Sequence, residues 1–206
     1  MAGDEPANEP RNAQGSDLAA DLDAFLARHE DELIEFRRDL HAHPELANAE
    51  HRTTRRVALR LAAAGLRPVI LPKGTGLMVD IGTLDEQDAY TDRPVVALRA
   101  DLDALPMADE KDVPYRSTVP NACHACGHDV HTTVLLGTGL YLAAQAAAGS
   151  LPGRVRLVFQ PAEEAASGAL DVLAAAWAAR YRPVPSNTVV WTSWPHAWQA
   201  FGTVER

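Results

Sequence analysis

PVVALR at residues 94–99 and VRLVF at residues 155–159 decide the fold class of this chain. Both are short, uninterrupted apolar runs, the pattern typical of strands that are buried on both faces of a sheet. Between them lies an Ala- and Leu-rich stretch that predicts a long helix over residues 129–148, with Asp129 as its N-cap. Strands that alternate with helices predict an α/β fold, here an α/β/α sandwich with a largely parallel sheet.

The segment before the first buried strand changes its hydrophobic period. Apolar side chains recur every three or four residues from Leu18 to Leu40, which predicts a helix that begins after an Asp17 cap and ends before Pro44. A second helix is expected over residues 50–64. Two short strands, 67–71 and 76–81, should follow as a pair joined by a Gly-containing turn. After the second buried strand, a further helix is expected to begin near residue 165 and to reach at least residue 175.

Composition excludes several classes of protein. The chain has 206 residues and a net charge of −9, with 19 Lys and Arg against 28 Asp and Glu, which argues against nucleic acid or an anionic membrane as partner. No apolar run approaches the ~20 residues that a membrane span needs. The first residues are polar and acidic, unlike a secretory signal, and two cysteines form no disulfide framework. We therefore expect a cytoplasmic protein.

Three polar clusters follow the predicted strands or precede the central helix. They are residues 99–103, residues 123–129 and the pair Glu163 and Glu164. Ligands of open α/β sheets bind outside the carboxyl ends of the strands, so these clusters should converge there. A thiolate, an imidazole and paired carboxylates on adjacent loops predict a divalent metal site with a general base beside it.

Each cluster also has a simpler interpretation. Cys123 and Cys126 have the spacing of a redox pair or half a zinc ribbon, although no second pair is present. Adjacent glutamates often only begin a solvated helix, and Asp101 and Asp103 suit a turn equally well. Two histidines, His41 and His43, close a helix before proline, which favours helix-end capping over metal binding.

Four motifs together resemble the amidohydrolase branch of the M20 metallopeptidases, the group of aminoacylases, hippurate hydrolases and auxin-conjugate hydrolases. They are LHAHPEL at 40–46, ALRADLDALPM at 97–107, HACGHDVHTTVLLGT at 124–138 and VFQPAEE at 158–164. The resemblance covers about residues 32–175. It implies the α/β/α sandwich of the zinc-dependent exopeptidases and hydrolysis of the amide bond of N-acyl amino acids or related amides.

The resemblance also implies a site. Cys126 and His128 stand where the family's CGH motif ligates metal, with the Cys126 thiolate bridging two ions. Glu163 is similar to the family's general base and Glu164 to a metal ligand. Asp101 resembles the acidic residue that supports the site and is grouped with Glu163 as catalytic. The implied cofactors are divalent metals, two per site, of a kind such as zinc, manganese, cobalt or nickel. Cys123, by contrast, has no ligand role in this scheme.

The last thirty residues differ from the rest of the chain. All four tryptophans lie between Trp177 and Trp198, and no leucine follows Trp177. We expect three parts: a disordered leader over 1–17, the N-terminal part of the catalytic domain over 18–176, and an atypical Trp-rich tail over 177–206. A frameshift is one explanation of the tail, and a genuine short variant with a new tail is the other. His196 does not match the family's H-x-x-P ligand motif.

The sequence leaves three interpretations of function open. The first is a metal-dependent amidohydrolase acting on a small N-acyl amino acid or amide. The second is a truncated, inactive relative with a partial metal site, because the family's lid domain, through which its members form homodimers, is missing together with its later histidines. A thiol- or metal-binding protein that uses the CxxC pair is a third, weaker alternative.

Overall fold

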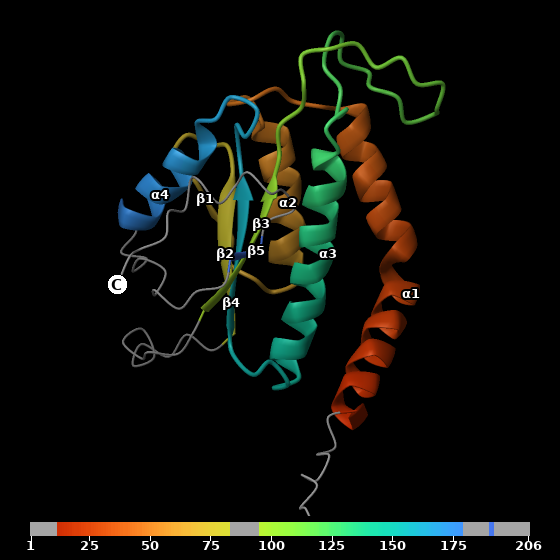
Figure 1. Ribbon diagram of the computed structural model, residues 1–206, viewed down its shortest axis with the longest axis vertical. Coiled ribbons are helices and arrows are strands. Elements are labelled where there is room, and N and C mark those ends of the chain that lie inside the picture. The colour runs from red at the N-terminus through yellow and green to blue at the C-terminus, as the bar shows by residue number, and fades with distance from the viewer. Residues whose placement is uncertain (1–11, 83–94, 179–189, 192–206) are drawn as a thin grey trace, which may run out of the picture.

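The computed structural model describes residues 12–82, 95–178 and 190–191, and all structural statements below refer to these residues. The elements are α1 (Asn12–Ala42), α2 (His51–Ala63), β1 (Val69–Ile70), β2 (Leu77–Ile81), β3 (Val95–Asp101), α3 (His128–Ala147), β4 (Arg154–Gln160), α4 (Gly168–Ala178) and β5 (Val190–Trp191). Figure 1 shows one sheet with helices on both of its faces. The expected α/β fold is confirmed.

The sheet is mixed rather than largely parallel, which corrects the expectation from the sequence. Its order is β1-β2-β4-β3-β5. β3 runs parallel to β4 and β5, whereas β2 is antiparallel to both β4 and β1. The connections explain two of these pairs: α3 provides the long crossover that a parallel β3–β4 pair requires, whereas a tight turn joins β1 to β2 and makes that pair antiparallel.

Two apolar layers hold the helices to the sheet. Leu77 and Phe159 face the larger core, which α1, α2 and α3 cover. Their neighbours Met78 and Val158 point to the opposite face and pack with Val172 of α4. This alternation of side chains along β2 and β4 is what a strand buried on both faces produces. The sheet is therefore sandwiched, as the α/β/α expectation requires.

Helix α1 begins earlier than expected. It starts at Asn12, so Asp17 lies within the helix and residues 12–17, which we assigned to the leader, are helical. No proline follows Pro10 until Pro44, so nothing in this stretch of sequence forces a later start. The helix ends at Ala42, as Pro44 predicts. The rest of the expected leader, residues 1–11, lies outside the described residues.

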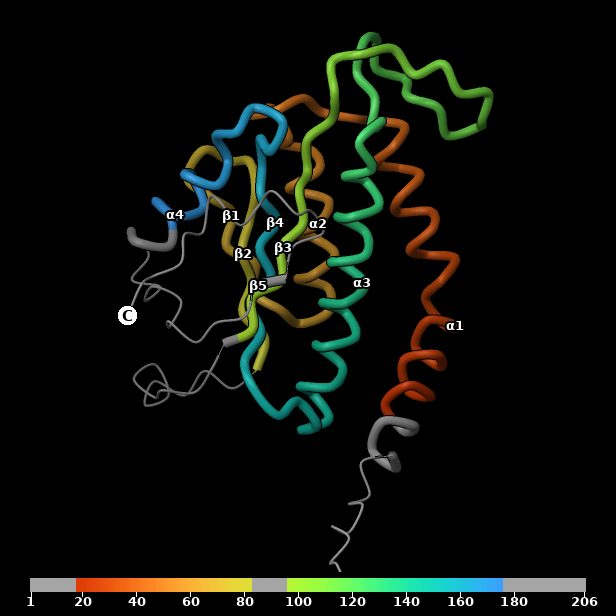
Figure 2. Tube along the Cα trace, viewed as in Figure 1, coloured from red at the N-terminus to blue at the C-terminus, as the bar shows by residue number. Residues whose placement is uncertain are grey.

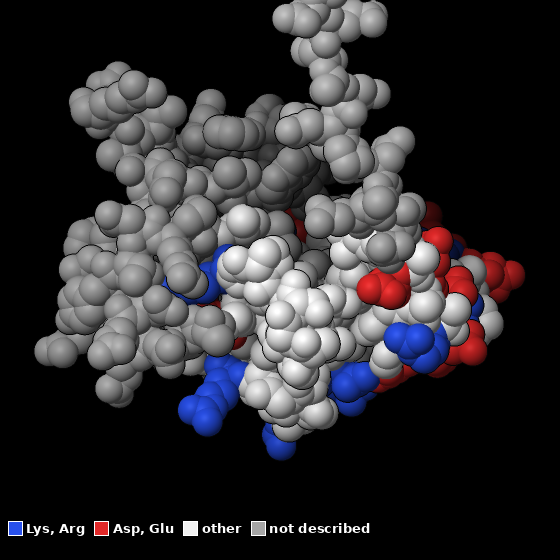
Figure 3. Space-filling model, turned by 90° about the horizontal axis from the view of Figure 1, so that it is seen from below, with Lys and Arg blue, Asp and Glu red and all other residues white. Residues whose placement is uncertain are grey.

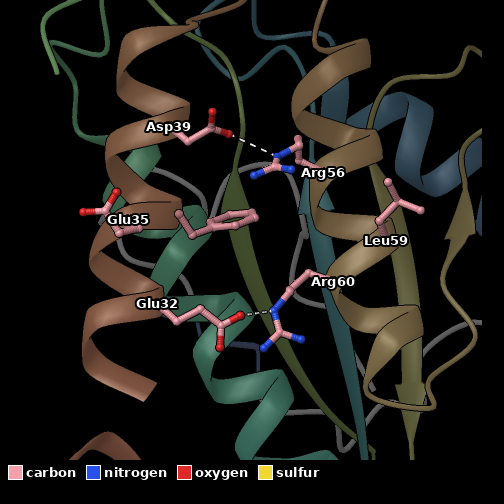
Figure 4. A pocket seen from close by; sticks show the side chains of 7 residues that line it. Glu32, Glu35, Asp39, Arg56, Leu59 and Arg60 are labelled. Atoms are coloured by element: carbon pink, nitrogen blue, oxygen red, sulfur yellow. Dashed lines mark hydrogen bonds and ion pairs between the residues drawn. The ribbon is translucent and has the colours of Figure 1, made fainter. Parts of the chain in front are cut away.

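Ion pairs fasten α1 to α2 along a surface groove (Figure 4). Arg60 pairs with Glu32, and Arg56 Nε lies 3.1 Å from Asp39 Oδ2. The Arg56 guanidinium also lies over the ring of Phe36, at 5.9 Å from its centroid. The charges that line this groove are thus largely paired with each other, so the groove serves to join two helices.

The two ends of the molecule differ. A long loop from residue 102 to residue 127 projects past α1 and α3, at the end where β3 and β4 terminate (Figure 2). Seen from the opposite end, the described surface carries basic side chains spread among uncharged ones, with acidic side chains toward one side (Figure 3). The polar clusters of the sequence lie at the end with the long loop.

Candidate metal centre

Asp101 is the last residue of β3 and lies at the centre of the candidate site. Its side chain is buried, with Oδ1 at 2.7 Å from His131 Nδ1 and Oδ2 at 3.2 Å from Arg99 Nη1. Burial opposes ionisation, but the contacts with His131, His128 and Arg99 outweigh it and lower the pKa of Asp101. Asp101 is therefore a carboxylate held rigidly at the end of the strand.

His128 is the first residue of α3 and points into the same space. Gly127, the residue before it, has a φ of +89°, a conformation that glycine adopts without strain. His128 Nδ1 lies 2.8 Å from the backbone oxygen of Asp103, and its Nε2 then faces three carboxylates. Nε2 lies 3.7 Å from Asp101 Oδ1, 3.8 Å from Glu163 Oε2 and 3.9 Å from Glu164 Oε1.

The Glu163–Glu164 pair is carried by a turn after β4. Ala162 and Ala166 have positive φ values of 49° and 51°, so α4 begins only at Gly168 and not near residue 165 as expected. The backbone N–H of Glu164 donates to Asp103 Oδ2 over 2.9 Å. This bond joins the loop after β4 to the loop after β3, and so holds both carboxylates over the site.

Negative charge dominates the electrostatics of the site. Burial would lower the pKa of His128, but its contacts with Asp103 and Cys126 and the charge of Asp101 raise that pKa to about 11. Burial, together with the neighbouring Asp101, raises the pKa of Glu163. Carboxylates crowded around one imidazole form a region that a cation would neutralise.

The donor atoms present fit a divalent metal. Cys126, His128 and Glu164 each offer one ligand atom, and these atoms lie within 4.8 Å of one another. Sulfur, imidazole nitrogen and carboxylate oxygen are the ligands that zinc and related ions prefer. The five residues singled out from the sequence are thus placed around one space: Asp101, Cys126, His128, Glu163 and Glu164.

Two residues of the site were missed by reasoning from sequence. His131 forms a second possible ligand group with Asp101 and His128. Its position three residues after His128, on the same face of one helix, was the signal that could have found it. Asp103 was left open as a turn residue, yet it contacts His128, Cys126 and the Glu164 amide. That role depends on contacts among the long loop, the start of α3 and the loop after β4, and it has no local signal.

The structure also shows the contacts of the histidines and cysteines that the sequence left open. His43 Nδ1 lies 2.8 Å from the Asp39 carbonyl oxygen, a contact within the last turn of α1 that agrees with helix-end capping. His41 does not cap: it is buried, with Nδ1 at 2.7 Å from Asp129 Oδ2. Asp129 correspondingly does not cap α3, whose N-cap is Gly127. Cys123 and Cys126 are both free thiols, and His196 lies outside the described residues.

The known proteins that are similar to this chain are longer than the segment that matches it. Over 143 residues it is 42% identical to the N-acetylcysteine deacetylase of Bacillus subtilis, a match that covers 69% of this chain and 36% of that protein. It is also 50% identical over 147 residues to a Rhodococcus jostii protein that bears the name of a glutamate–cysteine ligase; the match covers 71% of this chain but 17% of that protein. The chain thus spans about a third or less of these relatives.

A solved structure shares the fold. The Bacillus subtilis YXEP protein, described as a dinuclear metal-binding peptidase of the M20 family, is 41% identical, with a TM-score of 0.63. The match covers 75% of this chain and 40% of that one. Among the described residues, no helix is long and apolar enough to cross a membrane. The model of peptidase family M20/M25/M40 matches residues 97–199, which hold the candidate metal centre, and the chain belongs to this family.

Proposed function

We propose that the chain carries the metal-binding half of an amidohydrolase site that cleaves the amide bond of N-acyl amino acids or related small amides. One observation carries this proposal: the ligand atoms of Cys126, His128 and Glu164 converge within 4.8 Å, with Glu163 beside them. Membership of the M20 family supports hydrolysis of amide or peptide bonds. The N-acyl amino acid as substrate is supported by the name of the Bacillus subtilis deacetylase.

Cys126, His128 and Glu164 would hold the metal, and Asp101 would keep His128 and His131 in place. A bound divalent ion supplies Lewis acidity, which polarises the amide carbonyl and makes a water molecule acidic enough to lose a proton near neutral pH. Cys126, two residues before the start of α3, would contribute its sulfur as a thiolate ligand to the divalent metal held there.

Glu163 is proposed as the general base. It does not belong to the ligand cluster, and its carboxylate lies 3.8 Å from His128 Nε2, beside the cluster. Its pKa, raised by burial and by Asp101, improves its ability to take a proton from water and to give it to the departing amine nitrogen. The reaction then consumes one water molecule and yields a carboxylic acid and an amine.

Two substitutions test this assignment on the full chain. Glu163→Gln should keep the metal content and lower turnover of N-acetyl-L-cysteine by about 10²–10⁴-fold, because only proton transfer is removed. Cys126→Ala should lose the metal of the candidate metal centre as well as turnover. Glu35→Gln removes a carboxylate from an exposed position on α1 and is the matched control. Metal analysis after dialysis measures the metal content of each variant, and an assay on a panel of N-acyl amino acids measures its turnover.

A second candidate function is a metal-binding relative without turnover. It is favoured by the small number of ligands in the described cluster. This alternative predicts that the unsubstituted chain retains metal and hydrolyses no member of the panel. Turnover that Glu163→Gln abolishes would eliminate it, whereas metal content and rate that neither substitution changes would overturn both functions. Homodimerisation and a cytoplasmic location remain expectations from the family resemblance and from composition.

A further inference from the structure

A second group of metal-ligating side chains lies outside the candidate metal centre. His41 comes from α1, and Asp109 and Cys123 come from the long loop between β3 and α3. Each offers one ligand atom, and these atoms lie within 4.8 Å of one another. His41 and Cys123 are at most 2% exposed, and the side chain of Asp109 is 1% exposed. Buried imidazole, carboxylate and thiol groups at this separation have the composition of a metal-binding site.

A cationic group already occupies the middle of this cluster. Lys111 Nζ lies 2.9 Å from Asp109 Oδ1, 3.3 Å from His41 Nε2 and 3.6 Å from Cys123 Sγ. The Lys111 ammonium thus marks a position where a positive charge lies close to three potential metal-ligating atoms. The Lys111 side chain is 45% exposed, unlike the residues it contacts, so it can turn outward into solvent.

His41 is oriented as a metal-ligating histidine is. Its Nδ1 lies 2.7 Å from Asp129 Oδ2 and 3.3 Å from Arg37 Nη2, and its Nε2 faces the cluster, 3.3 Å from Asp109 Oδ2. With the ring proton on Nδ1, the lone pair of Nε2 is directed at the cluster. Arg37 Nε, at 2.8 Å from the same Asp129 oxygen, balances the charge of Asp129. Metal-bound histidines commonly rest on a carboxylate in this way.

Two further polar groups lie beside the cluster, the His124 ring and the Ser117 backbone N–H. His124 is buried with neither ring nitrogen hydrogen-bonded. Asp109 accepts the Ser117 backbone N–H over 3.0 Å in addition to the Lys111 bond, and its pKa is held well below the usual range despite burial. Asp109 is therefore a fixed negative charge.

We propose that His41, Asp109 and Cys123 form a second site for a soft divalent cation such as Zn²⁺ or Co²⁺, with Lys111 as its exchangeable lid. The mixed N, O and S ligand set favours these ions over Mg²⁺ or Ca²⁺. The exchange conserves the charge of the pocket: the ammonium leaves for solvent, Cys123 releases one proton to water, and one divalent cation enters. The cation then faces one thiolate and one carboxylate.

The two cysteines of the chain allow a test that is independent of the proposed hydrolysis. In a Cys126→Ser chain, Cys123 is the remaining cysteine, so any thiolate-to-cobalt charge-transfer absorption reports this site. We expect that absorption to appear on titration with Co²⁺ and to saturate at one thiolate-bound ion per chain. Adding Lys111→Met should tighten the binding by about tenfold, because the ion no longer displaces a hydrogen-bonded ammonium. Lys73→Met, at an exposed lysine that pairs with Asp171, is the matched control and should change nothing.

The other outcomes overturn the proposal. They are the lack of thiolate absorption at saturating Co²⁺ in a Cys126→Ser chain that is folded by circular dichroism, and an equal affinity with Lys111 or Met at position 111. If the Cys126→Ser chain does not fold, the comparison moves to the unsubstituted chain. There, Cys123→Ser should remove one bound cobalt ion and part of the thiolate absorption, and an unchanged stoichiometry would again overturn the site.

Discussion

At the scale of single residues, the two ring nitrogens of His128 have different partners. Nδ1 faces the backbone oxygen of Asp103 at 2.8 Å, and Nε2 faces the carboxylates of the site. A neutral His128 therefore carries its proton on Nδ1 and keeps Nε2 free for a cation. Without a cation, a second proton takes its place, which is why the pKa of His128 rises to about 11.

This makes the stability of the metal-free protein depend on pH. Because the folded-state pKa of about 11 exceeds the unfolded value of about 6.5, the contribution of His128 is complete below pH ~6.5 and is lost as pH rises toward 11. We expect the free energy of unfolding, measured in urea with a chelator, to fall across this range. His128→Gln should flatten the curve. A slope that this substitution leaves unchanged would assign the effect to other groups.

Residue positions next to strands could be predicted from the sequence, but pairs between distant segments could not. His128 and Cys126 were found because they begin or shortly precede a predicted helix, and the glutamate pair because it follows a buried strand; their roles came from the resemblance to the M20 family. Asp129 was taken for an N-cap because it stands near the start of a helix. Its actual partner, His41, lies 88 residues away, and no local pattern connects the two.

At the scale of elements, the junction of β4 and α4 has almost no free space. A Cβ built on Gly168 would lie 1.5 Å from the carbonyl oxygen of Pro161, which is backbone and cannot move aside as a side chain would. Ala162 in the same turn donates its N–H to the buried carboxylate of Glu50 over 2.7 Å. The turn that carries Glu163 and Glu164 is therefore fixed from two sides.

Gly168→Ala should disturb this junction. We expect a loss of about 1–3 kcal/mol in the free energy of unfolding, as for other overpacked sites, together with weaker metal retention because Glu164 shifts. Gly153→Ala is the matched control, since a Cβ there meets no atom within 4 Å. Thermal melts and metal analysis of both variants provide the measurement. Equal behaviour of the two variants would show that the turn tolerates the shift.

The types of the elements followed from the sequence, but the direction of one strand did not. β3, α3 and β4 lie within a few residues of their expected bounds because their hydrophobic patterns are strong. β2 has the same apolar composition as a parallel strand, since it too is buried on both faces. Its antiparallel pairing with β4 depends on how the chain returns between β2 and β3, which hydrophobic patterning does not encode.

At the scale of the whole molecule, β5 pairs with one edge of the sheet. Val190 and Trp191 pair with Ala97 and Leu98 of β3, so the described part of the Trp-rich segment belongs to the fold. The family match likewise extends to residue 199. The edge of β3 would otherwise present unpaired backbone groups.

Removing this cover should promote self-association. We expect a chain that ends at residue 178 to form larger species at rising concentration, measured by light scattering, because the edge of β3 becomes available to a second copy. A chain that ends at residue 191 keeps β5 and is the control. Identical scattering from the two shortened chains would show that β5 does not protect the edge.

Among the described residues, the ligands assigned to the candidate metal centre come from residues 101–164, around a single strand–helix–strand unit built from β3, α3 and β4. The ribosome releases a chain N-terminus first, so α1 and α2 are already made when this unit emerges. A cation bound once this unit has left the ribosome would clamp the loop after β3 to the loop after β4, so metal supply during folding should raise the yield of folded protein.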